Sequence, residues 1–147
     1  MVHVQGLADA GWEDVAVVAV ETQGAASFAA AYEAGDPGVS LQAIDSVATS
    51  LGALQVCGTS VEHAARHPGG VHTAIVSDAE AVSACASFLD DHRVLVEPAC
   101  GAALSLFYSD RHASLLQSFR DVTVVVCGGS GVNMEILSTW QSQLNCE

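Results

Sequence analysis

The alternation of apolar runs with amphipathic segments predicts a chain in which strands and helices follow one another. Residues 15–20 (VAVVAV) and 122–126 (VTVVV) are continuous β-branched apolar runs, which are typical of strands covered on both faces. Shorter apolar runs predict further strands at 54–57, 72–76 and 94–96. Because strands that alternate with helices form parallel sheets, the pattern predicts an α/β fold with a parallel sheet.

The segments between these runs have the composition of helices. Helices are predicted at residues 2–10, 25–34, 44–51, 59–66, 77–89, 99–108 and 132–144. The best-defined start is at Ser77, where Glu80 completes a capping box. The strands are few and uneven for 147 residues, and the first element is a helix, so the pattern resembles the later part of a longer fold.

Composition narrows the classes of partner. Hydrophobic residues make up 50% of the chain and charged residues 14%, which favours a buried core over disorder. Lys+Arg is 4 against Asp+Glu 17, and all four cations are arginines, so the chain has no lysine. This deficit of cations argues against binding to nucleic acid or to an anionic membrane surface.

The termini and the cysteines favour a cytoplasmic location. The first residues show no basic leader with an apolar run, and no stretch of the sequence is long and apolar enough for a membrane span. The five cysteines are odd in number and have no C-x-x-C spacing, and four of them lie in apolar runs. Reduced, buried cysteines are the usual interpretation of this pattern.

The segment at 122–131 (VTVVVCGGSG) is the best local signal for a ligand site. Glycines after a strand let the backbone approach a ligand, and a following helix offers free N–H groups to an anion. The spacing does not match G-x-G-x-x-G, and a tight structural turn is the alternative. Cys127 is interpreted as a nucleophile, a cofactor contact or a packed thiol, and the lack of a nearby cation weakens the first of these.

Two glutamates directly follow predicted strands. Glu21 follows the run at 15–20, and Glu97 follows the run at 94–96. A carboxylate at the carboxyl end of a parallel strand often belongs to a site, and Glu21 with nearby carbonyls is a candidate ligand set for a hard cation. The alternative for each glutamate is that it caps the helix that follows.

Four segments taken together resemble one enzyme family. They are AVETQGAASF at 19–28, SVATSLGA at 46–53, VEPACGAALSLFYSD at 96–110 and VVVCGGSG at 124–131. Their order and spacing resemble the L-serine dehydratase/L-threonine deaminase family, including the animal serine dehydratase-like proteins. The resemblance covers only the later half of such enzymes. It implies an incomplete fold type II (tryptophan synthase β-like) architecture, with residues 1–147 as the C-terminal portion and the catalytic-lysine portion absent.

The resemblance also implies roles for particular positions. Cys127 matches the residue that meets the pyridine nitrogen of pyridoxal 5'-phosphate, and Gly128 and Gly129 match glycines that approach its ring. The positions that match ligands of a potassium ion are Glu21, Ala25, Leu51 and Ala53. Gly131 stands where the family has an asparagine. No catalytic residue is assigned within the chain, because it has no lysine for the Schiff base.

The family's activity is the β-elimination of L-serine or L-threonine, which gives pyruvate and ammonia from serine. The implied partners are a small-molecule amino acid and, in the complete protein, a second copy in a homodimer. Three hypotheses follow. The chain is part of such a dehydratase, with apolar surface exposed where the rest would pack; it is a non-catalytic truncated paralogue that acts as a binding or regulatory module; or it is a small α/β enzyme that uses Cys127.

Overall fold

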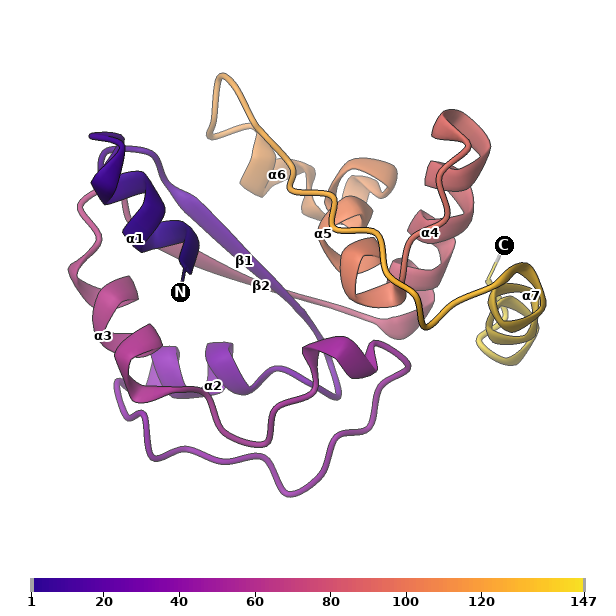
Figure 1. The fold of residues 1–147 in the computed structure, drawn as a ribbon, viewed down its shortest axis with the longest axis horizontal. Coiled ribbons are helices and arrows are strands. Elements are labelled where there is room, and N and C mark those ends of the chain that lie inside the picture. The colour runs from indigo at the N-terminus through magenta and orange to yellow at the C-terminus, as the bar shows by residue number, and fades with distance from the viewer. Residues whose placement is uncertain (1, 147) are drawn as a thin grey trace.

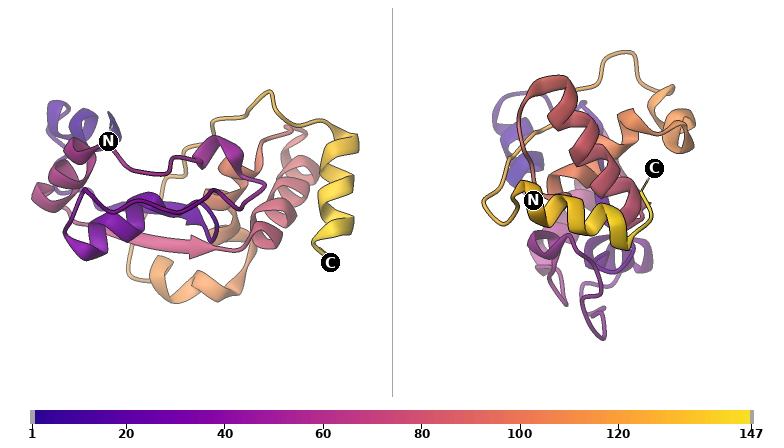
Figure 2. Two further views of the ribbon diagram at one scale, coloured as in Figure 1. Left: turned by 90° about the horizontal axis from the view of Figure 1, so that it is seen from below. Right: turned by 90° about the vertical axis from the view of Figure 1, so that its right-hand side faces the viewer.

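The computed structural model describes residues 2–146 and has the mixed α/β character that the sequence predicts (Figure 1). The order of elements is α1 (Val2–Asp9), β1 (Val17–Thr22), α2 (Ser27–Ala34), the 3-10 helix η1 (Thr49–Leu51), α3 (Gly58–Arg66), β2 (Val71–Val76), α4 (Asp78–His92), α5 (Pro98–Tyr108), the 3-10 helix η2 (Asp110–His112), α6 (Ala113–Leu116) and α7 (Met134–Gln143). The strands lie centrally, with α1 to α3 toward one end of the molecule and α4, α5 and α7 toward the other (Figures 1 and 2).

β1 and β2 form a parallel pair, in register from Val17 opposite Val71 to Thr22 opposite Val76. Alternate residues of β1 face opposite sides of the pair, as the period of a strand requires. Val17 and Ala19 pack against the cluster that contains Phe28 of α2, Ala64 of α3 and Val71 of β2. Val18 and Val20 pack against Ala102 and Leu106 of α5. Both faces are therefore covered, which explains why the part of the run that lies in β1, residues 17–20, is apolar throughout.

The largest core cluster lies where α4 and α5 pack together and α7 closes over them. Val82 and Cys85 of α4, Val96, Leu104 of α5 and Leu137 of α7 are buried in it. The predicted capping box begins α4, because the Ser77 hydroxyl accepts from the Glu80 N–H and the Glu80 carboxylate accepts from the Ser77 N–H. This local signal is confirmed.

Two elements predicted between α2 and α3 are wrong. The helix predicted at 44–51 is only the short turn of η1, and the strand predicted at 54–57 is a single antiparallel bridge between Ser40 and Gln55. Polar contacts hold this segment instead. The Asp78 carboxylate accepts from the Ser46 hydroxyl at 2.6 Å and from the Val47 N–H at 2.9 Å, which fixes the chain in a non-helical path.

The strands predicted at 94–96 and 122–126 are also absent from the described residues. Val96 is fully buried in the α4–α5 cluster, so this apolar run reflects burial rather than strand pairing. Val122, Val125 and Val126 are exposed, with Val125 54% exposed. A strand needs a neighbour for its backbone groups, and the described chain places none beside 122–126.

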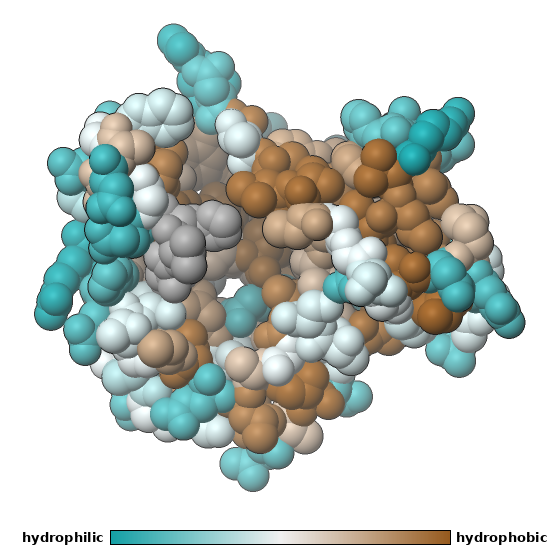
Figure 3. Space-filling model, viewed as in Figure 1, coloured by the Kyte–Doolittle hydropathy of each residue, from teal (hydrophilic) through white to brown (hydrophobic). Residues whose placement is uncertain are grey.

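Apolar side chains reach the surface in several places, and the face in Figure 3 shows broad apolar areas across its centre and right side. The exposed large apolar residues are Trp12, Val15, Leu54, Ile75, Val94, Phe107, Tyr108, Val122, Val125, Val126 and Met134. None of the helices in the described part of the chain is long and apolar enough to cross a bilayer.

Candidate functional site

The glycine loop, residues 127–131, follows the exposed apolar run at 122–126 and lies against the start of α5. Gly128 and Gly129 have φ angles of 79° and 133°, which side-chain-bearing residues rarely adopt. A Cβ atom added at Gly129 would overlap the side chain of Glu97. The glycine at 129 is therefore required for the close approach of the loop to Glu97.

Glu97 is the residue that joins the loop to the rest of the fold. One carboxylate oxygen accepts from the Gly131 N–H at 2.6 Å, and the other accepts from the Ser50 hydroxyl of η1. The Glu97 N–H donates to the Gly128 carbonyl at 3.0 Å. One residue thus contacts both ends of the glycine loop and also η1, which comes from a distant part of the sequence.

The contacts of Glu97 distinguish between the two roles that the sequence leaves open for it, a carboxylate of a site and a cap of the following helix. It is the N-cap residue of α5, yet its side chain makes no capping hydrogen bond within the helix. Its backbone carbonyl accepts from the Cys100 and Gly101 N–H groups, so the backbone begins the helix while the carboxylate serves the loop. The hydrogen bonds from Ser50, then Gly131 and Ser130, lower the pKa of Glu97, so the carboxylate is ionised at neutral pH.

Cys127 begins the glycine loop and has an exposed side chain. Its backbone N–H donates to the sulfur of Cys100 at 3.4 Å, and Cys100 is buried in the first turn of α5. The loop is therefore held to the start of α5 at both ends, by Cys100 at one and by the Glu97 carboxylate at the other. This leaves the Cys127 thiol and the Gly128–Gly129 backbone at the surface.

Glu21 lies at the carboxyl end of β1 and is only 8% exposed. Its two oxygens accept from the N–H groups of Phe28 and Ala29, at 3.0 and 2.8 Å, in the first turn of α2. The structure therefore shows the helix-capping role that was the alternative for this residue. Burial raises the pKa of Glu21, and the hydrogen bonds from Ala29 and Phe28 oppose that rise.

The other three positions that match cation ligands lie just after β1, in η1 and just after η1. Ala25 is fully buried in the turn between β1 and α2. Leu51, like Val20, packs against the cluster that contains Ala102, and its carbonyl accepts from the Ala53 N–H at 2.9 Å. Among the described residues, no group of three or more His, Cys, Asp or Glu side chains gathers in a way that could hold a metal.

A chain of hydroxyl contacts near the end of β1 was missed by sequence reasoning. Thr22 and Ser46 are joined by a hydrogen bond between their hydroxyls at 2.8 Å, and Ser46 continues to Asp78, just beyond β2. These contacts bring the segment that leads to η1 beside the carboxyl ends of both strands. The sequence signal was present, since small polar residues follow both strands, but local pattern does not say which of them meet.

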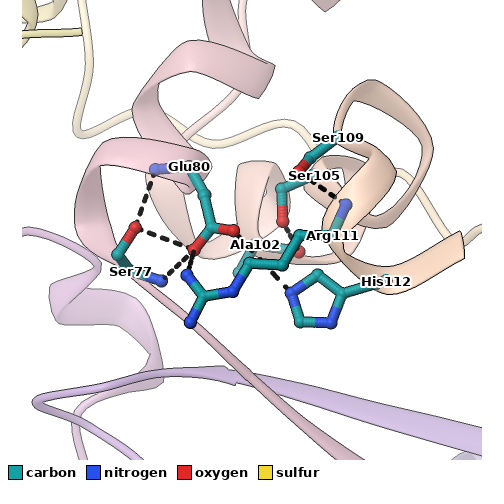
Figure 4. Close-up of polar contacts among 7 residues, drawn as sticks. All are labelled: Ser77, Glu80, Ala102, Ser105, Ser109, Arg111 and His112. Carbon is teal, nitrogen blue, oxygen red and sulfur yellow. Dashed lines mark hydrogen bonds and ion pairs between the residues drawn. The ribbon is translucent and has the colours of Figure 1, made fainter.

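A second polar cluster lies where η2 meets the start of α4 (Figure 4). The Glu80 carboxylate accepts from the N–H and hydroxyl of Ser77, at 2.7 and 2.8 Å, and from the Arg111 guanidinium at 3.3 Å. His112 points at the same carboxylate, with its Nε2 3.8 Å away and buried. Burial alone would raise the pKa of Glu80, but the Ser77 hydrogen bonds, Arg111 and His112 together lower it. These contacts hold η2 against the first turn of α4, where the capping box lies.

The fold and the glycine loop define the class of protein. It is an α/β protein with parallel strands and a glycine loop that a carboxylate holds in place. A family model described as "Pyridoxal-phosphate dependent enzyme" matches residues 3–128, so the chain belongs to the pyridoxal-phosphate dependent enzymes. It is 45% identical to the serine dehydratase-like protein of Mus musculus over 96% of this chain and 44% of that protein. It is 43% identical to the L-serine dehydratase/L-threonine deaminase of Homo sapiens, with the same coverage of 96% and 44%.

Solved structures agree with this assignment. An L-serine ammonia-lyase from the fungus Rhizomucor miehei superimposes with a TM-score of 0.89 at 38% identity, over 96% of this chain and 45% of that one. A maize serine racemase shares the fold, with a TM-score of 0.73 at 24% identity over 94% of this chain and 42% of that one. The chain thus has the fold type II architecture, and it spans less than half the length of the relatives that it matches.

Proposed function

We propose that residues 1–147 are the C-terminal portion of a pyridoxal-phosphate dependent L-serine (L-threonine) dehydratase, which converts serine to pyruvate and ammonia by β-elimination. The observation that carries the proposal is the glycine loop, held at both ends against α5 with the Cys127 thiol exposed. The identity of 41–45% to animal serine dehydratases over nearly the whole chain supports the choice of reaction.

The residues present fit one wall of a cofactor site. Gly128 and Gly129 present backbone without side chains, which suits contact with a flat aromatic ring, and Cys127 places a small polarisable group beside them. In the proposal, this thiol faces the pyridine nitrogen and the two glycines face the ring. When bound, pyridoxal phosphate supplies an electron sink for the bond that breaks at the substrate α-carbon.

In the proposed reaction, the role of this chain is to position the groups that contact the cofactor. A thiol that faces the ring nitrogen supplies no formal negative charge, unlike a carboxylate, and this suits elimination. The ionised Glu97 holds the loop by its N–H groups, so the thiol and the glycines keep one orientation. The amine that bonds to the cofactor has to come from outside these residues, because the chain contains no lysine.

The proposal also assigns Glu21, Ala25, Leu51 and Ala53 to a monovalent cation. The placement of η1 beside the ends of both strands supports it, since Leu51 lies in η1 and Ala53 follows two residues later. Each Glu21 oxygen already accepts one N–H, so an ion would use the remaining lone pairs. Thermal unfolding in potassium chloride and in choline chloride at equal ionic strength tests this, with a higher Tm expected in potassium. Equal midpoints in the two salts would contradict it.

The substrate, the assembly and the location follow from the same proposal. The partner molecule is a small amino acid, the complete protein is a homodimer, and the five cysteines, all free, suit the cytoplasm. The exposed Val122, Val125 and Val126 support a missing neighbour, because an apolar extended run is stable when another segment covers it.

Fragment complementation tests the reaction. The 147-residue chain is mixed with the lysine-bearing N-terminal part of the mouse serine dehydratase-like protein, and pyruvate formation from L-serine is measured with added cofactor. We expect no pyruvate from either part alone and measurable pyruvate from the mixture. As a matched pair, Cys127→Ala is expected to lower the rate and Cys146→Ala to leave it unchanged, since Cys146 lies outside the glycine loop and donates to the Ala79 carbonyl.

The outcomes separate the proposal from its alternative. A stable complex that binds the cofactor but forms neither pyruvate from serine nor 2-oxobutyrate from threonine supports the non-catalytic paralogue. The intact mass of the native protein is a second measurement. A mass near 15.1 kDa would favour the regulatory module, whereas a mass about twice as large, with a lysine-bearing segment upstream, would support the dehydratase.

A further inference from the structure

The start of α5 and the start of the glycine loop bring the sulfur of Cys100 close to the backbone of Cys127. The Cys100 sulfur lies 3.4 Å from the backbone nitrogen of Cys127, and that nitrogen is bonded to the carbon that carries the Cys127 side chain. Rotation about the Cys127 side-chain torsion therefore moves its sulfur across the region that the Cys100 sulfur already contacts. Disulfides require this closeness of the two main chains.

We propose that Cys100 and Cys127 form an oxidative modification site, at which a hydroperoxide converts the two thiols into an intramolecular disulfide. The exposed Cys127 thiolate attacks the peroxide oxygen, which gives a sulfenic acid and releases hydroxide. The Cys100 thiolate then attacks the Cys127 sulfur, so the S–S bond forms while the S–O bond breaks and a second hydroxide leaves. The two hydroxides take up the two protons that the thiols released. Two thiols and one hydrogen peroxide thus give one disulfide and two waters.

The other cysteines are arranged so that they do not compete for this pairing. Cys85 is fully buried beside Cys100, and burial raises the pKa of its thiol to about 12, so it remains protonated and inert. Cys146 donates to the carbonyl of Ala79 in another part of α4. Cys57 is exposed, and its hydrogen bond with Thr59 lowers the pKa of its thiol, so it reacts with peroxide by itself.

The consequence rests on the proposed function. Cys127 is the thiol that faces the cofactor in that proposal, and a disulfide with Cys100 draws it toward the first turn of α5. The loop would then hold its sulfur against the helix, not toward a bound ring. Oxidation would therefore switch off cofactor binding at this wall, and thiol reductants would restore it.

Mass spectrometry of the full chain tests the modification without reference to catalysis. In a Cys57→Ser background, treatment with hydrogen peroxide is expected to remove two hydrogens from the intact mass and to protect Cys100 and Cys127 from alkylation. Peptide mapping should then find one linked peptide that contains both residues. Cys146→Ser is the matched control and should form the same linkage, whereas Cys100→Ser should leave Cys127 as a sulfenic acid or a higher oxide.

Three results would overturn the proposal. They are a disulfide between Cys85 and Cys100, a disulfide between two chains, and the addition of oxygen at Cys127 while Cys100 stays fully alkylatable. The complementation assay then separates the two proposals. If pyruvate forms with the reduced chain, falls with oxidation and returns with dithiothreitol, both stand. If the disulfide forms but the reduced chain never supports pyruvate formation, only the proposed function fails.

Discussion

The carboxylate of Glu97 provides the sharpest test of the site, because two substitutions separate its charge from its hydrogen bonds. In Glu97→Gln, the side-chain oxygen can still accept from the Gly131 N–H, and the amide can donate to the Ser50 hydroxyl, which also accepts. The geometry is kept and only the charge is lost. In Glu97→Ala, both hydrogen bonds are lost and the loop keeps only its contacts through Cys100 and the Glu97 N–H.

The expected magnitudes follow from these contacts. Hydrogen bonds to charged groups contribute about 1.5–3 kcal/mol and neutral ones about 0.5–1.5, and partial solvent exposure puts this site at the lower end of each range. The free energy needed to open the loop should therefore fall by about 0.5–1 kcal/mol in Glu97→Gln and by about 1.5–2 kcal/mol in Glu97→Ala. Since about 1.4 kcal/mol is a factor of ten, amide exchange at Gly131 should quicken roughly tenfold or more in the alanine variant.

Hydrogen exchange followed by NMR measures this directly, with Glu62→Gln as the matched control. Glu62 is a surface glutamate of α3 that pairs with Arg66 at 3.9 Å, far in sequence from the loop. The lowered pKa of Glu97 means that its contribution is present above the ordinary pKa of a glutamate and is lost as pH falls through the folded value. The wild type and Glu97→Gln should therefore converge in acid. Unchanged exchange at Gly131 in Glu97→Ala would refute the reasoning.

Four further predictions concern stability. Ser77→Ala should lower the free energy of unfolding by about 1 kcal/mol in urea melts, because the capping box of α4 is lost, and no loss would mean that the box is not formed in solution. Glu21→Ala should cost about 2–4 kcal/mol, since two N–H groups of α2 lose their acceptor. Because the pKa of Glu21 is raised in the folded protein, the wild type should lose unfolding free energy relative to Glu21→Gln as pH rises through that pKa. A difference in unfolding free energy that does not change with pH would contradict this. The Cys100–Cys127 disulfide should raise the unfolding free energy by about 3–4 kcal/mol, and a lower midpoint after oxidation would show strain.

Local signals in the sequence gave the most accurate predictions. The helix that follows Ser77 is in place because a capping box is determined by residues three apart. The strand near 15–20 is in place because β2 pairs with it and helices cover both of its faces. The run at 122–126 is apolar and β-branched like the run at 15–20, but it is not a strand. β-branched apolar residues encode a requirement for burial, and pairing needs a second segment that local pattern does not supply.

The candidate site was predicted only in part for the same reason. Its glycines and Cys127 are visible as a motif, because the strained backbone of a loop restricts residue type locally. The partners of Glu97 lie 47 and 34 residues away, at Ser50 and Gly131, and nothing in the spacing of the sequence joins them. Such contacts depend on the tertiary path of η1, which sequence reasoning had placed in a helix.

The two glutamates show how the same local context leads to opposite roles. Glu21 lies several residues before α2, so its carboxylate reaches the free N–H groups of that helix and is buried with them. Glu97 is the N-cap residue itself, and glutamate is not among the short side chains that normally cap a helix from this position. Its carboxylate is left free to extend away from α5, where the glycine loop and η1 meet it. The long side chain that makes glutamate a poor cap thus lets it join α5, the glycine loop and η1. A serine or an aspartate at position 97 would be too short to reach the loop and η1.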